Sequence, residues 1–231
     1  RSLAMLTEKG IRIVAEYLQM VRDTVGDEVE ISADHFVGRN VNNMTRVGHA
    51  LASTKMAWIE EPVSLRDVNQ LKALRDAIDS PIATGEEIYG REYFQTLCDR
   101  QAVDFVHPDM ATAGGILETK RIGDYAEDYG IKQALHYAGT PVSFMANVHS
   151  AAATQNCRVL EYHPEGAEIS EWTDMVRTTG GQALITDGFA NVPDSPVLGI
   201  ELNMEHVKRV IDPDDRTIFL PTGDWNSRKG S

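Results

Sequence analysis

Three acidic residues recur at one interval in the first part of the chain. Asp34, Glu60 and Glu86 are each separated by 26 residues, and each ends a short apolar segment. If these segments are neighbouring strands, the three carboxylates lie at one height, where two unit charges about 4 Å apart repel by about 4 kcal/mol at an effective dielectric constant near 20. Mg²⁺, a hard cation that prefers oxygen ligands, would remove this repulsion. The spacing therefore predicts a Mg²⁺ site, whereas one such residue alone would indicate a solvated acid at the start of a loop.

Asp109 and His136 form a second candidate group, 27 residues apart, at the ends of the two strands predicted after the last acidic ligand. A carboxylate beside an imidazole fixes its tautomer and raises its basicity, so this pair predicts a general base. Without the pairing, His136 would be interpreted as a core histidine. Five other histidines have no such partner in the pattern, and we expect them to be structural or exposed: His49, His107, His149, His163 and His206.

Glu61 and Glu87 directly follow two of the predicted ligands. Successive residues of a strand face opposite sides, so only one member of each doublet can face the metal. We expect the second members to hydrogen-bond neighbouring loops or other groups around the site.

The elements that must position these residues alternate strictly. Short apolar segments that predict buried strands are residues 28–34, 57–62, 81–87, 104–110, 132–137 and 158–163. Amphipathic segments that predict helices are residues 7–25, 41–55, 65–79, 90–100, 115–129 and 141–155. This alternation indicates an α/β protein with a parallel sheet, either a TIM-type barrel or an open doubly wound fold.

The position of the polar residues favours the barrel. Six candidate residues each lie where a predicted strand ends: Asp34, Glu60, Glu86, Asp109, His136 and Glu161. In a barrel, all such strand ends converge on one mouth. A complete barrel has eight strand–helix units, so the six units here predict an incomplete one. We expect residues 1–211 to form a C-terminal barrel domain and residues 212–231 a tail. The first strands would precede residue 1, and that part of the same protein would complete the barrel.

The composition and charge of the chain limit the kinds of partner that we expect it to bind. The chain has 231 residues, 42% of them hydrophobic, and a formal net charge of −13. This charge repels nucleic acid and anionic membrane surfaces, and no apolar run is long enough for a membrane span. Cys98 and Cys157 form no CxxC pair and are too few for a disulfide framework, which favours a cytoplasmic location.

Several motifs together resemble the mandelate racemase branch of the enolase superfamily. They are "WIEEP", "TGEE", "HPDMATAGGI", "ALHYAGTP", "VLEYH" and "GFANVPDSPVLGIEL", and they extend over nearly the whole chain. The muconate-lactonizing branch has a catalytic lysine in the region of Asp109, so that branch fits less well. The resemblance implies Mg²⁺ as cofactor, homo-oligomers, and a small hydroxy-carboxylate as substrate. It also implies an N-terminal α+β capping domain, which would precede residue 1.

The resemblance also implies roles for individual residues. The three acidic residues would be the Mg²⁺ ligands, Asp109 and His136 the acid/base dyad, and Glu161 a catalytic group that hydrogen-bonds the substrate carboxylate. The implied reaction is dehydration of a sugar acid to a 2-keto-3-deoxy acid. Racemization or cycloisomerization at the same site, and a barrel that binds metal without turnover, stay open as alternatives.

His35 is a departure from the family pattern. Some family members have a polar or catalytic residue two positions after the first ligand, but that position is Phe36 here. Strand parity would turn His35 outward unless a bulge intervenes. We hold His35 as a candidate substrate-binding residue or acid, with a structural role as the alternative.

Overall fold

The computed structural model describes residues 6–65, 67–162 and 173–210. The chain divides into two compact units, each treated separately below. The first comprises Arg1–Gly139 and Ala146–Tyr162, and the second comprises Thr140–Met145 and His163–Ser231. The domain boundary expected at residue 211 lies outside the described residues.

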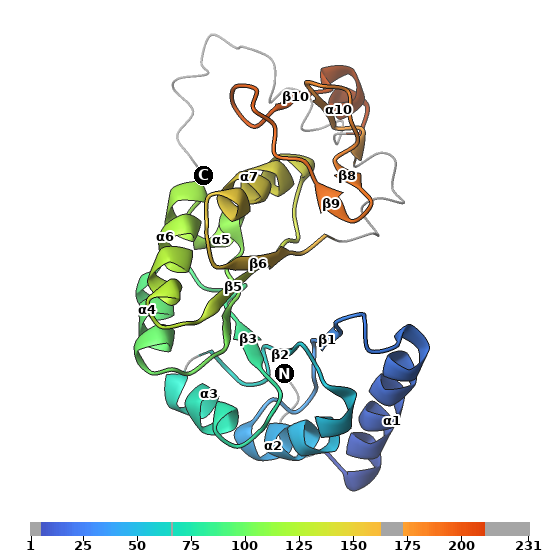
Figure 1. Cartoon of the computed structure of the whole chain (residues 1–231), viewed down its shortest axis with the longest axis vertical. Helices are drawn as coiled ribbons and strands as arrows, with labels where there is room; N and C mark the ends of the chain where they lie inside the picture. The colour runs from blue at the N-terminus through green and yellow to red at the C-terminus, as the bar shows by residue number, and fades with distance from the viewer. Residues whose placement is uncertain (1–5, 66, 163–172, 211–231) are drawn as a thin grey trace. The chain divides into compact units, whose positions relative to one another are not determined.

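The first unit is built on one parallel sheet of six strands (Figure 1). The strands are β1 (Ser32–Ala33), β2 (Trp58–Glu60), β3 (Ile82–Thr84), β4 (Phe105–Val106), β5 (Lys132–Leu135) and β6 (Cys157–Leu160). Their order in space is their order in the chain, and every neighbouring pair is parallel. A doubly wound sheet reverses this order at a switch point, so the observed sheet is that of an incomplete TIM-type barrel, as predicted.

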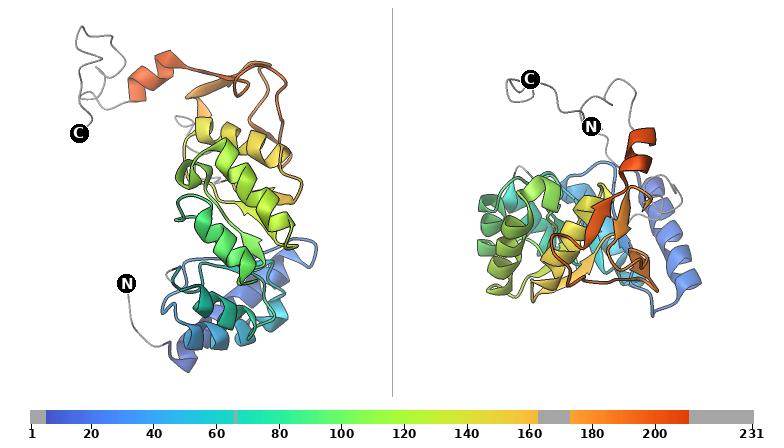
Figure 2. Two further views of the ribbon diagram at one scale, coloured as in Figure 1. Left: turned by 90° about the vertical axis from the view of Figure 1, so that its left-hand side faces the viewer. Right: turned by 90° about the horizontal axis from the view of Figure 1, so that it is seen from above.

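Helices connect these strands close to the predicted positions. They are α1 (Glu8–Val25), α2 (Val41–Ala50), the 3-10 helix η1 (Ala52–Thr54), α3 (Val68–Arg75), α4 (Glu92–Asp99), α5 (Met110–Ala113), α6 (Ile116–Glu127) and α7 (Pro141–Ala152). The starts of α1, α2 and α3 carry side-chain caps, because Thr7, Asn40 and Asp67 each accept a backbone N–H of the following turn. Helices α4 and α6 lie side by side against the sheet (Figure 2).

The predicted strand over residues 104–110 is too long. Pairing in β4 stops at Val106, and Asp109 accepts the N–H groups of Ala111 and Thr112 as the cap of α5. The following glycines, Gly114 and Gly115, have φ angles of 121° and 93° and separate α5 from α6. The proline–aspartate sequence thus turns the chain at the end of the strand.

The alternation of side chains explains the sequence "WIEE". Ile59 belongs to the large apolar core of the first unit. Trp58 packs instead with Ala83 and Ala134 in a small cluster on the other face of the sheet. Since residues two apart share a face, Trp58 and Glu60 both point to the barrel interior.

Among its described residues, the second unit contains two short antiparallel pairs, helix α10 and the beginning of α7. Strand β7 (Val176–Thr178) pairs with β10 (Ile200–Leu202), and β8 (Ile185–Thr186) pairs with β9 (Phe189–Ala190). Asp187 and Gly188, with φ angles of 51° and 80°, form the tight turn between β8 and β9. Helix α10 spans Met204–Val210. In the described parts of both units, no helix combines the length and apolar character needed to cross a bilayer.

Candidate active site

The predicted site residues all lie in the first unit, at the carboxyl ends of its strands. Asp34 follows β1 directly, Glu60 is the last residue of β2, and Glu86 lies two residues after β3. Asp109 forms an isolated parallel bridge with His136, which follows β5, and Glu161 follows β6. The structure therefore brings these side chains to one end of the sheet.

Asp34, Glu60 and Glu86 form a cluster of three carboxylates. One oxygen from each lies within 4.8 Å of the others. Oδ1 of Asp34 is buried and has no hydrogen-bond partner among the described residues. Burial, together with the negative charge of the neighbouring carboxylates, raises the pKa of both Asp34 and Glu86. Three crowded anionic oxygens with an unused buried oxygen fit a hard divalent cation.

Glu60 is held more firmly than the other two members of the cluster. Nε1 of Trp58 donates a hydrogen bond of 3.0 Å to its Oε2, and Nε2 of His107 lies 3.2 Å from its Oε1. Burial alone would raise the pKa of Glu60, but the contacts with His107 and Trp58 lower it overall. Glu60 is therefore a fixed carboxylate with a strong preference for the charged form.

Glu61 turns away from the cluster and secures the next loop. Its φ angle of 43° places it in the left-handed region, and its side chain is buried. Oε1 accepts hydrogen bonds from Oγ1 of Thr84, at 2.6 Å, and from the backbone N–H of Gly85, at 2.8 Å. The prediction that Glu61 bonds a neighbouring loop is confirmed, and the loop it holds is the one that carries Glu86.

Asp109 and His136 are in direct contact. Oδ2 of Asp109 lies 2.8 Å from Nδ1 of His136, while Oδ1 accepts the two backbone N–H groups that begin α5. Burial disfavours the charged form of each group, but their mutual hydrogen bond lowers the pKa of Asp109 and raises that of His136. The other ring nitrogen, Nε2, lies 3.2 Å from Oε2 of Glu86. The ring is thus held by Asp109 with Nε2 facing the carboxylate cluster.

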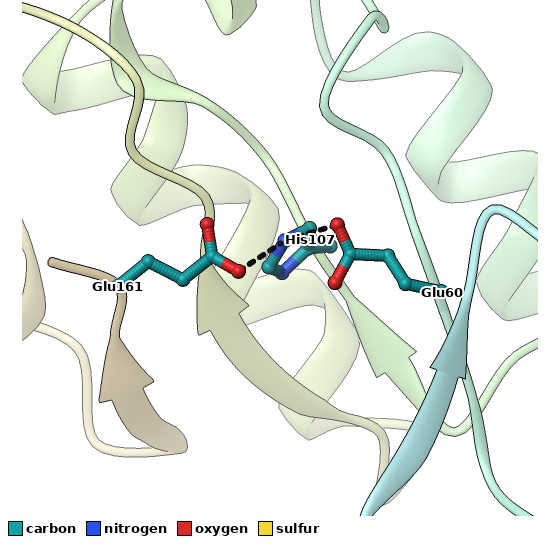
Figure 3. A group of neighbouring side chains, drawn as sticks. All are labelled: Glu60, His107 and Glu161. Carbon is teal, nitrogen blue, oxygen red and sulfur yellow. Dashed lines mark ion pairs between the residues drawn. The ribbon is translucent and has the colours of Figure 1, made fainter. Parts of the chain in front are cut away.

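His107 has acidic partners that the sequence pattern did not reveal. Its side chain is fully buried, and Nε2 lies 3.2 Å from Oε1 of Glu60 and 3.5 Å from Oε1 of Glu161 (Figure 3). The expectation that His107 lacks such a partner is wrong. His107 precedes Asp109 by two residues, a spacing that would place both on one face of an extended strand, but this spacing does not show which residues His107 contacts.

Glu161 and His35 lie at opposite edges of this group of strand ends. Oε2 of Glu161 accepts the backbone N–H of Tyr137 at 3.2 Å. His35 has a φ angle of 58° and a side chain that is 85% exposed, with Nδ1 lying 2.8 Å from Oδ2 of Asp34. The structure therefore places His35 beside the first carboxylate of the cluster, on its solvent side, and its binding of substrate stays a prediction.

The fold and the site together define a class of protein: a (β/α) barrel with a carboxylate cluster and an aspartate–histidine pair at its strand ends. The family described as Enolase C-terminal domain-like matches residues 5–207. The chain belongs to this family.

Known relatives agree with this assignment. The chain is 32% identical over 193 residues to D-xylonate dehydratase of Haloferax volcanii, a match that covers 84% of this chain and 46% of that protein. It is 28% identical over 215 residues to D-galactarolactone cycloisomerase of Agrobacterium fabrum, covering 90% of this chain and 54% of that protein. The chain spans about half the length of these curated relatives.

A solved structure is similar over most of the chain. The mandelate racemase/muconate lactonizing enzyme-like protein of Rubrobacter xylanophilus superposes with a TM-score of 0.86 at 31% sequence identity. The match covers 93% of this chain and 54% of that one. The family model and this solved structure both agree with the resemblance of the sequence motifs to the mandelate racemase branch.

Proposed function

We propose that this chain carries the catalytic centre of a Mg²⁺-dependent sugar-acid dehydratase, a hydro-lyase acting on an aldonate or aldarate. The observation that carries the proposal is the contact between Asp109 and His136, with Nε2 of His136 facing three clustered carboxylates. This arrangement would supply a base next to a cation site. The D-xylonate dehydratase relative supports a sugar acid as substrate and loss of water as the reaction.

Asp34, Glu60 and Glu86 would hold the Mg²⁺ that members of the enolase superfamily bind. Bound there, the cation would lower the energy of the enediolate that forms when a carboxylate substrate loses its α proton. Positioned acid/base groups alone accelerate a reaction by about 10²- to 10⁴-fold. Removal of an α proton from a carboxylate would therefore also need a cation that stabilises the enediolate.

The residues of this chain account for the proton transfers. His136 would accept the α proton of the substrate at Nε2, and Asp109 would stabilise the imidazolium through Nδ1–H. The imidazolium can then give this proton to the departing β hydroxyl as the C–O bond breaks, so one water leaves and the ring returns to its neutral form. His35 is the second candidate for this acid. Glu161 would bind the substrate carboxylate.

Cycloisomerization is the second candidate function, favoured by the relative named D-galactarolactone cycloisomerase. Both reactions begin with removal of an α proton. One experiment separates them: the protein in its full natural length is incubated with Mg²⁺ and a panel of aldonates, aldarates and their lactones in D₂O. A 2-keto-3-deoxy product supports dehydration, whereas deuterated product without loss of water supports isomerization. No turnover and no α deuterium across the panel would contradict both.

We also infer that further segments of the same protein cover part of the first unit. Ile13, Tyr17 and Met20 recur on one face of α1 and are more than half exposed. Apolar stripes at this spacing are usually packed against another element. The greater length of the relatives supports an additional barrel segment as the occupant, and homo-oligomers as the assembled form stay a prediction. The test is quenching of Tyr17 fluorescence in the full-length protein. If the ring is quenched as readily as in a free peptide, this inference fails.

A further inference from the structure

His107 occupies one layer of a two-layer arrangement of side chains. Barrel interiors are filled in layers, and the members of one layer come from alternate strands. Glu60, His107 and Glu161 come from the ends of β2, β4 and β6 and contact one another through the imidazole (Figure 3). His136 and Glu86, which touch at 3.2 Å, come from β5 and β3. His136 and the Glu60–Glu161 pair therefore belong to different layers.

The His107 ring is fixed at both nitrogens. Nδ1 lies 2.9 Å from the carbonyl oxygen of Ala134, and the side chain has no exposed surface. A carbonyl oxygen only accepts, so Nδ1 carries a hydrogen. Nε2 lies within ion-pair distance of two carboxylate oxygens without the alignment of a full hydrogen bond to either. It is shared between Glu60 and Glu161.

We propose that His107 is a positioning residue that sets the distance between the metal site and the substrate-carboxylate site. The inference rests on the proposed function, because it takes Glu60 as a metal ligand and Glu161 as the group that binds substrate. The imidazole is a rigid spacer with one donor directed at both carboxylates. Removing it leaves two buried or half-buried anions facing each other, and both would move apart.

A bound metal is the competing interpretation of the same three residues. Glu60, His107 and Glu161 offer donor atoms within 4.8 Å of one another. A transition metal would require an unprotonated Nε2 and would replace the shared hydrogen. The two interpretations differ in whether Co²⁺ or Zn²⁺ binds in a way that depends on His107.

The test uses the full-length protein and the variant His107→Gln. Partners that orient metal ligands typically contribute about 10- to 100-fold in metal affinity. We expect Mg²⁺ affinity, measured by calorimetry, to fall by about 10-fold and KM for the sugar acid to rise by a similar factor. Because His136 lies in the other layer, kcat is expected to change by a smaller factor than the Mg²⁺ affinity or KM. Loss of kcat alone, with Mg²⁺ affinity and KM unchanged, would overturn the proposal.

Gln133→Leu is the matched control. Gln133 is also fully buried, and its Nε2 donates to the carbonyl oxygen of Thr119, away from the site. This variant should lose stability without changing Mg²⁺ affinity or KM. If both variants change the two constants equally, the effect of His107 is general destabilisation and the proposal is wrong.

A double-mutant cycle keeps the proposal testable if no sugar acid is turned over. His107→Gln, Glu161→Gln and the double variant are compared for Mg²⁺ affinity and for unfolding by urea. Coupling in both measurements supports the bridge, and additive effects in Mg²⁺ affinity overturn it. A Co²⁺ absorption band that is lost in His107→Gln would overturn it in favour of a metal site. None of these readouts depends on the reaction, so failure of the dehydratase proposal and failure of this one are distinguishable.

Discussion

His107 and His136 both contact carboxylates, but their side chains differ in exposure to solvent. Each imidazole lies between two carboxylates, and the ring centroids are 5.6 Å apart. The side chain of His107 is 0% exposed and that of His136 is 15% exposed. The contacts with Glu161 and Glu60 overcome the effect of burial and raise the pKa of His107 to about 10.

This difference in solvent exposure separates two roles of a contact between a carboxylate and a histidine. An imidazole closed off from solvent and held at both nitrogens can only fix its neighbours. An imidazole held at one nitrogen, with the other facing an accessible carboxylate cluster, can move a proton. The predictions below test this distinction, beginning with the largest expected effect.

His136→Asn should remove turnover almost completely. General acid/base catalysis contributes about 10²- to 10⁴-fold, and an amide cannot take up the α proton. We expect kcat to fall by about 10⁴-fold and α-proton exchange in D₂O to stop, while calorimetry shows nearly unchanged Mg²⁺ affinity. His49→Asn is the control, because His49 is exposed on α2 and its Nε2 lies 2.9 Å from the carbonyl oxygen of Ala77, a residue outside the candidate site. Elimination of water at an unchanged rate in His136→Asn would mean that another residue is the base.

Glu60→Gln should weaken Mg²⁺ binding more than any change at His136. At an effective dielectric constant near 20, a unit charge about 4 Å from a divalent cation contributes up to about 8 kcal/mol, and water and the remaining amide oxygen of glutamine recover part of this energy. We expect an affinity loss of about 10²- to 10³-fold in calorimetric titration. Undiminished affinity would show that the carboxylate cluster is not the Mg²⁺ site.

Asp109→Asn should impair the enzyme less completely than His136→Asn. The proposed base, His136, is still present, but its ring loses the charged partner that would orient Nδ1–H and stabilise the imidazolium. We expect kcat to fall by about 10²-fold with Mg²⁺ affinity unchanged. Equal losses in the Asp109 and His136 variants would show that the two residues act only as one unit.

Strand positions were predictable because each strand repeats one pattern: an apolar run closed by a polar residue. That pattern alone assigns Asp34, Glu60 and Glu161 to strand ends. Two features were not predictable. Left-handed backbone at His35 and Glu61 is imposed by tertiary contacts rather than by residue type. The partners of His107 come from strands two places away on either side, a relation that spacing along the chain does not display.

Glu61→Gln tests whether position in a doublet decides a residue's role. Glu61 adjoins Glu60 but bonds Thr84 and Gly85, so its loss should be felt through the loop that carries Glu86. Glutamine keeps an acceptor oxygen for both donors but places an NH2 group where the second carboxylate oxygen was, and an unsatisfied buried donor costs about 1–3 kcal/mol. We expect a loss of stability in that range in urea unfolding, with Mg²⁺ affinity reduced by only about 10-fold. A loss of Mg²⁺ affinity as large as that of Glu60→Gln would show that both glutamates are ligands.

His35→Ala should have the smallest effect of the series. His35 repeats the carboxylate–imidazole contact of His136, with Nδ1 2.8 Å from Asp34, but its side chain is 85% exposed. Exposed ion pairs are worth about 0–1 kcal/mol because water screens them. If solvent exposure makes the contact ineffective, kcat, KM and Mg²⁺ affinity should each change by less than about 5-fold, which corresponds to that energy. Steady-state kinetics and calorimetry on the full-length protein measure all three. If His35 is instead the acid that protonates the leaving hydroxyl, kcat falls by about 10²-fold or more while α-proton exchange continues in D₂O. That result would add His35 to the accessible imidazoles that transfer protons.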